Sequence, residues 1–144
     1  MNAEEYLEQI GYLDEVIEKK ESQREEWFTK AISTTAPITE RVQTSSNGNK
    51  LENATIKYME EVEKIDNRVY ELRKERQKIL DTIEKLNNKN QLGVLYKIYV
   101  EYDAYETYQK IADAYGKSYN WVNFIKGRAI KNLQKILDEM ECDM

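Results

Sequence analysis

The stretch that decides the fold is residues 111–133, IADAYGKSYNWVNFIKGRAIKNL. Its first apolar segment stops at Gly116, and glycine best tolerates the left-handed backbone conformation that ends many helices. Ser118 can then cap a new helix by accepting a hydrogen bond from an early backbone N–H. The apolar residues that follow recur at spacings of three and four and share one face: Val122, Ile125, Ala129, Leu133 and Leu137. We therefore expect two short helices joined by a tight turn, the second helix being amphipathic.

A helix–turn–helix of this kind presents its second helix to the major groove of DNA, so the leading hypothesis is nucleic-acid recognition. The charge distribution agrees, because residues 107–137 hold six basic residues against one acidic residue, Asp113, whereas residues 1–86 hold 14 basic and 19 acidic residues. The six basic residues are Lys110, Lys117, Lys126, Arg128, Lys131 and Lys135. Because this footprint is modest and an acidic tail follows it, we expect DNA affinity to be weak and salt-sensitive.

Steps of about 100° per residue place one set of side chains opposite the apolar stripe of the second helix. These are Asn120, Phe124, Gly127, Lys131 and Lys135, with Asn123 and Arg128 flanking them. Asparagine can make a two-pronged contact with adenine, and an aromatic edge can touch a thymine methyl group. Trp121 points sideways and is expected to pack rather than to touch DNA.

These residues also carry a family resemblance. The C-terminal part, about residues 90–138, resembles region 4 of bacterial sigma factors at Ile111, Ala112, Gly116, Lys117, Ser118, Val122, Ile125, Arg128, Ala129, Ile130 and Leu133. The whole chain resembles small phage proteins of Gram-positive bacteria, including ArpU-like regulators. That wider match is carried by MNAEEYLEQI at the start, by residues 41–46 and by residues 119–129.

The resemblance implies a sequence-specific, double-stranded DNA-binding transcriptional regulator of phage or prophage late genes, which reads the major groove with helix 118–137. It places Tyr119, Asn120, Asn123 and Phe124 at base-reading positions and Arg128 at a phosphate-contacting position. Lys117, Ser118 and Lys131 complete the predicted DNA-binding set. RNA polymerase is a further partner that it suggests. Sigma factors mostly carry charged residues at the base-reading positions, so their promoter specificity is not carried over.

Two other functions remain open. The chain can be a coiled-coil protein-interaction adaptor whose helix–turn–helix binds protein, which the apolar Phe124 and the scarcity of arginine favour. A small terminase-like DNA-packaging protein is the second alternative. Those proteins usually place the helix–turn–helix before the oligomerising helices, which is the reverse of the order here.

The N-terminal part predicts two long helices. A first stripe runs through residues 3–32 at alternating steps of three and four: Tyr6, Ile10, Leu13, Ile17, Lys20, Arg24, Trp27 and Ala31, widened by Leu7, Val16 and Phe28. A second runs through residues 51–86 in regular heptads: Leu51, Thr55, Tyr58, Val62, Ile65, Val69, Leu72, Arg76, Ile79, Ile83 and Leu86. Such heptads are typical of a coiled coil. We favour an intrachain antiparallel hairpin, while a second chain is the alternative partner and a homodimer through the remaining surface stays open.

The segments between these helices carry turn signals. A break is expected at loop 33–50, which contains Pro37 and the pair Asn47-Gly48. Asparagines at 87–90 are expected to end the second long helix and cap the next one, over residues 92–100. Tyrosines follow at 96, 99, 102, 105 and 108, and we expect them to pack around a small core across a turn at 103–106. Thr107 is the expected N-cap of the following helix.

The predicted fold is therefore all-α: a helical hairpin over residues 1–88, then a helix–turn–helix domain over 89–144 with an acidic tail. Neither an enzyme nor a cofactor or metal site is expected, because the chain has no histidine, one cysteine and no phosphate-binding glycine loop. No apolar run approaches the length of a membrane span and no signal peptide is recognisable. Together with the single Cys142, this predicts a cytoplasmic protein.

Overall fold

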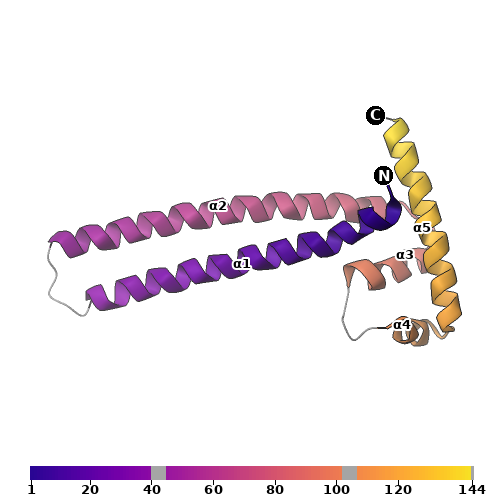
Figure 1. Cartoon of the computed structure of the whole chain (residues 1–144), viewed down its shortest axis with the longest axis horizontal. Coiled ribbons are helices and arrows are strands. Elements are labelled where there is room, and N and C mark those ends of the chain that lie inside the picture. The colour runs from indigo at the N-terminus through magenta and orange to yellow at the C-terminus, as the bar shows by residue number, and fades with distance from the viewer. Residues whose placement is uncertain (40–44, 102–106, 144) are drawn as a thin grey trace. The chain divides into compact units, whose positions relative to one another are not determined.

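The computed structural model describes residues 1–39, 45–101 and 107–143, with side chains omitted at 33–39 and 45–51. It is all-helical, and no strand occurs in these ranges, which confirms the predicted class. The elements are α1 (Ala3–Thr39), α2 (Ser45–Ile83), α3 (Lys89–Leu95), the π-helical segment η1 (Tyr96–Val100), α4 (Tyr108–Tyr115) and α5 (Tyr119–Cys142) (Figure 1).

The break expected at residues 33–50 is shorter in the structure, because both long helices extend into it. Helix α1 continues to Thr39 and α2 begins at Ser45, so residues 33–39 and 45–50 are helical. Proline lacks an N–H and crowds the preceding turn, which is why sequence reasoning ended the first helix before Pro37. Pro37 lies two residues before the end of α1, so the helix continues for less than one turn beyond it. Residues 40–44 lie outside the described residues.

Contacts group the chain into two compact units. We call Glu15–Lys74 the two-helix unit, and Met1–Asp14 with Glu75–Met144 the terminal unit. Both long helices contribute to each unit. The division drawn from sequence, at residues 88 and 89, stays a prediction.

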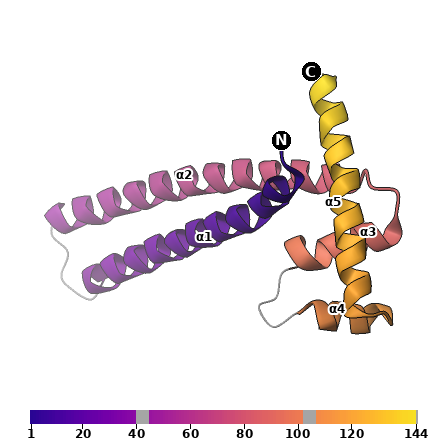
Figure 2. The ribbon, with the colours of Figure 1, turned by 45° about the vertical axis from the view of Figure 1, so that its right-hand side comes forward.

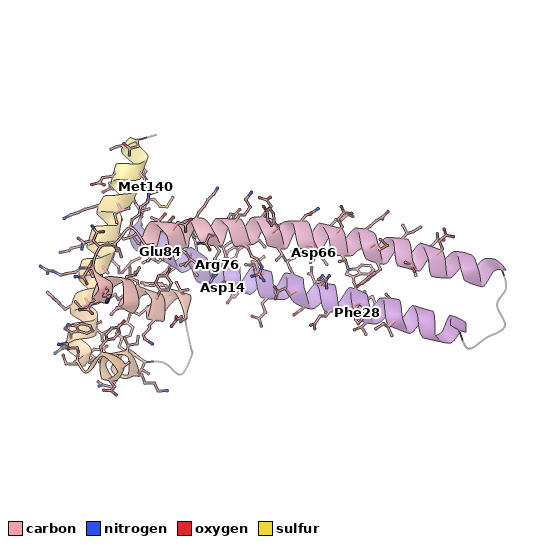
Figure 3. The ribbon with its side chains drawn as sticks, turned by 180° about the vertical axis from the view of Figure 1, so that it is seen from behind. Asp14, Phe28, Asp66, Arg76, Glu84 and Met140 are labelled. Atoms are coloured by element: carbon pink, nitrogen blue, oxygen red, sulfur yellow. The ribbon has the colours of Figure 1, made fainter. Side chains whose placement is uncertain are left out.

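In the two-helix unit, α1 and α2 run antiparallel. Glu21 pairs with Arg73, the Arg24 Nε donates to Asp66 Oδ1 at 3.0 Å, and the Phe28 and Tyr58 rings lie 6.5 Å apart. The partner number on α2 falls as the number on α1 rises, which defines the antiparallel direction; Figure 3 labels Asp66 and Phe28. The heptad positions from Tyr58 to Leu72 are all buried or half-buried, so the predicted stripe is the contact face of α2.

The terminal unit is organised around α5. Helices α3 and α4 both pack against it, with α4 at its N-terminal end (Figure 2). The buried apolar residues of this unit come from every element except η1, and also from the segment after α2: Ala3, Leu7, Ile10, Leu13, Ile79, Leu80, Ile83, Leu86, Val94, Leu95, Ile111, Ala112, Val122, Ile125, Ala129, Leu133 and Leu137. The Arg76 Nε donates to Asp14 Oδ1 at 2.7 Å, which satisfies the charge that interrupts the heptads of α2 (Figure 3).

The start of α1 is held on the C-terminal half of α5. The Ala3 N–H donates to Gln134 Oε1 at 2.8 Å, and Gln134 Nε2 donates to the Met1 carbonyl at 2.6 Å. The N-terminal amine also pairs with Glu141 at 2.8 Å. The Gln134 side chain thus hydrogen-bonds to an N–H and to a C=O of the same backbone segment. These two bonds fix the direction in which α1 leaves α5.

Helix α3 begins and packs through two local features. The Asn88 side chain accepts from the N–H groups of Asn90 and Gln91, at 2.9 and 3.1 Å, which confirms the expected asparagine cap. Further along, the Tyr115 hydroxyl of α4 lies against Gly93, at a place where a methyl group on that residue would overlap the oxygen. Glycine at 93 therefore lets the aromatic side chain of α4 approach the α3 backbone.

This close approach makes a double-mutant cycle informative. In a Tyr115→Phe background the hydroxyl is gone, but the ring carbon Cζ would still lie 3.3 Å from the new methyl group. We therefore expect Gly93→Ala to be nearly neutral there, because the higher helix propensity of alanine offsets this tight contact. In the presence of the hydroxyl the same change should be less favourable by roughly 1–2 kcal/mol, because the ring must shift. Urea denaturation of the four proteins gives the coupling free energy. Additive effects would show that the hydroxyl does not abut Gly93.

Candidate nucleic-acid interface

The turn between α4 and α5 has the geometry that its sequence predicts. Gly116 adopts φ 67° and ψ 34°, in the left-handed region, and ends α4. The Lys117 N–H donates to the Ala112 carbonyl at 2.8 Å, which closes the helix end. The Ser118 Oγ accepts from the Trp121 N–H at 3.2 Å, so Ser118 is the N-cap of α5. Thr107 caps α4 in the same way, and all three predictions are confirmed.

The apolar stripe of α5 is buried as expected. All five of its residues, Val122, Ile125, Ala129, Leu133 and Leu137, are at most 9% exposed. The N-terminal part of the stripe forms one cluster with Val94 of α3 and with Ile111 and Ala112 of α4. Trp121 packs on this cluster, with its ring 5.4 Å from that of Tyr115, as predicted. Burial of the stripe fixes both the angle of α4 to α5 and the face of α5 that stays in solvent.

That solvent face carries the predicted interface. All eight candidate residues are exposed: Lys117, Ser118, Tyr119, Asn120, Asn123, Phe124, Arg128 and Lys131. They lie in the turn and on the first half of α5, opposite or beside the buried stripe, and Lys135 continues the row. Tyr119 is 49% exposed and Phe124 58% exposed, so the two aromatic side chains are available for contact with a partner. The structure therefore brings the predicted residues onto one surface.

Two aromatic contacts order this surface. The Arg128 guanidinium lies over the Phe124 ring, 5.0 Å from its centroid, one helical turn away. The Tyr119 ring lies 5.9 Å from that of Tyr108 at the start of α4. Stacking restricts the rotamers of Phe124 and Tyr119, so less conformational entropy is lost when these two exposed side chains contact a ligand.

One basic residue of the segment has a structural role that the sequence analysis missed. Lys126 is half-buried; its Nζ donates to the Tyr108 hydroxyl at 2.8 Å and lies over the same ring. Burial lowers the pKa of Lys126, but the hydrogen bond to Tyr108 and the nearby Tyr99 hydroxyl outweigh it, so the pKa is raised. Lys126 thus stays cationic while tied to the edge of the core. Its spacing from Val122 and Ala129, four and three residues, was the available signal, because it sets Lys126 beside the stripe.

The tyrosine series is described at three positions, Tyr96, Tyr99 and Tyr108, and all three are half-buried. Tyr108 packs against the small core, as predicted. The Tyr96 hydroxyl donates to Glu84 Oε1 at 3.3 Å, and burial followed by the charge of Glu84 raises its pKa. Burial likewise raises the pKa of Tyr99. The expected helix over 92–100 is α3 continued by η1, whose wider turns were not predicted. Tyr102, Tyr105 and the expected turn at 103–106 lie outside the described residues.

Other kinds of site find no support in the described ranges. No group of three or more histidine, cysteine or acidic side chains there is placed to hold a metal ion, and Cys142 is exposed. None of the described helices is both long and apolar enough to cross a membrane. Comparison of the chain with protein-family models, curated proteins and solved structures finds no match in any of the three.

The two glycines at the interface should respond oppositely to the same substitution. Gly116→Ala should destabilise the protein by about 1–2 kcal/mol, since a Cβ is unfavourable in the left-handed conformation. Gly127→Ala should instead stabilise it by about 0.5–1 kcal/mol, because Gly127 is exposed within α5 and alanine is the better helix former. No heavy atom lies within 4 Å of a Cβ at either position, so packing does not confuse the comparison. Thermal denaturation followed by circular dichroism measures both, and effects of equal sign would contradict the assigned turn.

Proposed function

We propose that the chain is a sequence-specific, double-stranded DNA-binding transcriptional regulator that reads the major groove with α5. The observation that carries the proposal is the exposed row of polar, aromatic and basic residues on a helix whose opposite face is buried. A tight turn ending in a capped helix gives α5 a fixed position on α4, which reading a groove requires. The proposed arrangement is a helical hairpin followed by a helix–turn–helix domain.

Each exposed side chain suits a distinct contact. Asn120 and Asn123 offer amides that can bridge the N6 and N7 atoms of adenine, and Tyr119 and Phe124 offer edges for thymine methyl groups. The cationic side chains at 117, 128 and 131 suit phosphates. The Ser118 hydroxyl can donate to a phosphate while it accepts from the Trp121 N–H.

The biological setting of the proposal comes from the resemblance of the chain to sigma region 4 and to phage late-gene regulators. In that setting the DNA site belongs to a phage or prophage promoter, and RNA polymerase is a second partner. A homodimer would double the modest cationic footprint and read two half-sites. A terminase-like packaging role would use the same DNA-binding face.

A protein-binding adaptor is the alternative that one observation favours. Phe124 is 58% exposed, and Arg128, the one arginine of α5, is stacked on it. Aromatic and arginine side chains together are typical of the centre of a protein interface. The two functions differ in the expected role of Asn120 and Asn123. Their amides can hydrogen-bond to bases, whereas an apolar protein surface offers these amides no hydrogen-bond partner.

Substitutions that separate base reading from phosphate contact test the proposal. Asn120→Ala and Asn123→Ala should each weaken binding to a selected DNA site by about 1–3 kcal/mol and relax its sequence preference. Lys131→Ala should weaken binding to all sequences alike and reduce the salt dependence by about one unit. The measurement is fluorescence anisotropy with labelled duplexes at several salt concentrations.

Glu139→Ala, on the acidic C-terminal part of α5, is the control and should leave sequence preference unchanged. The proposal fails if no duplex is preferred over competitor DNA, or if both asparagine changes leave the preference intact. Loss of binding to a protein partner on Phe124→Ala, with no DNA preference, would instead support the adaptor.

A further inference from the structure

The two-helix unit exposes a group of large apolar side chains. Phe28 and Ile32 of α1 are 53% and 52% exposed, and Ile56 and Met59 of α2 are 47% and 63% exposed. Single exposed apolar residues are ordinary, but contiguous groups mark interaction surfaces. Whether these four are contiguous depends on which edge of the helix pair they occupy.

Heptad geometry places all four on the same edge. With the contact residues at a and d, Phe28 and Met59 take e positions, and Ile32 and Ile56 take the neighbouring b positions. In an antiparallel pair the e positions of the two helices face each other, and the Glu21–Arg73 ion pair, which joins two e positions, shows this directly. The Phe28 ring also reaches across to Tyr58. We call these four residues the apolar edge.

The seam beside the apolar edge is incompletely covered. In the two-helix unit only Ile17, Ile65 and Leu72 are buried among the described side chains. Tyr58, Val62 and Val69 occupy contact positions and are only half-buried. Two helices alone leave such residues partly in water, and a third helix laid along the edge would cover them.

Charge selects the kind of helix that fits. The e and b positions from 18 to 73 carry six acidic residues, Glu18, Glu21, Glu25, Glu52, Glu63 and Asp66, against one basic residue, Arg73. Over the same range, the g and c positions of the opposite edge carry six basic and three acidic residues. None of the exposed large apolar side chains described in the two-helix unit lies at these positions. Two of the acidic residues at e and b positions are already paired, Glu21 with Arg73 and Asp66 with Arg24. The negative charge that frames the apolar edge therefore comes from Glu18, Glu25, Glu52 and Glu63.

Pairing of two copies through the edges of their helix pairs does not match the apolar edge. Pairing edge to edge would bring the acidic frames together, and like charges across an interface are unfavourable. The opposite edge has the right charge but no exposed apolar stripe to offer. The complementary surface combines an apolar stripe with basic flanks.

We propose that the apolar edge is a docking site for an amphipathic helix of a partner protein, with an apolar stripe flanked by lysine and arginine. The partner helix would lie along the apolar edge, beside α1 and α2, as a third helix of the bundle. Its apolar side chains would cover Phe28 and Met59, and its flanking cations would meet the acidic frame. This proposal is independent of DNA binding by α5.

The test uses the full chain and a fluorescent synthetic helix of about three heptads, with a leucine stripe and lysine flanks. Anisotropy should show binding about tenfold tighter than for a matched peptide with glutamate flanks. Phe28→Ser and Met59→Gln should each weaken binding by about tenfold, as expected for apolar side chains covered in an interface. Tyr12→Ser, which alters a side chain that is 65% exposed in the terminal unit, should leave it unchanged.

A pair of adjacent charge reversals separates a local site from general attraction. Glu25→Lys alters the acidic frame at a b position, and should weaken binding of the lysine-flanked peptide. Glu26→Lys makes the same change in net charge at a c position on the opposite edge, and should have little effect. Circular dichroism confirms that each variant is folded. Any of three results would overturn the proposal. The peptide does not bind, or the two charge reversals have equal effects, or the chain self-associates in a way that Met59→Gln abolishes while no peptide binds.

Discussion

The structure of the terminal unit depends on burial of one apolar stripe along α5. That stripe is covered by α3 and α4, and its residues are among the least exposed in the protein. A helix whose one side must be buried has no freedom to rotate about its axis, because rotation would expose the stripe. The direction of the opposite face follows from this constraint. Burial of Val122, Ile125 and Ala129 in one core therefore places Asn120, Asn123 and Phe124 together on the opposite surface.

The sequence predicts those features that are encoded within a few residues. The left-handed Gly116 and the caps Ser118, Thr107 and Asn88 each involve bonds spanning five residues or fewer, so their signals are local. The stripe of α5 is periodic and buried, and the periodic heptad positions of α2 from Tyr58 to Leu72 are buried or half-buried. Contacts between distant residues leave no such signal. Nothing in the sequence near Gln134 indicates that it holds Met1 and Ala3, 133 and 131 residues away. The extent of α1 beyond Ser33 was missed for the opposite reason, since Pro37 is a strong local signal that the helix overrides near its end.

The basic residues of the C-terminal segment are not equivalent, although composition counts them alike. Lys126 donates to Tyr108 at the edge of the core, and its contribution is to packing. Arg128 is held over Phe124, so its guanidinium is presented with its rotamer already restricted. Lys117, Lys131 and Lys135 are exposed along the turn and helix. Flexible exposed lysines act mainly as point charges, whereas a stacked arginine also has a defined direction. Affinity and orientation of a polyanion would thus come from different residues of the same surface.

The two-helix unit shows how a sequence can contain more apolar character than its own fold uses. A helix pair needs apolar side chains at the a and d positions only, and its flanking positions are normally charged, which favours solubility. The g and c edge follows that rule. The e and b edge breaks it at Phe28, Ile32, Ile56 and Met59, which are 47–63% exposed to water. The apolar residues are explained by a function of the edge itself, and the acidic residues along it limit which partner can cover it.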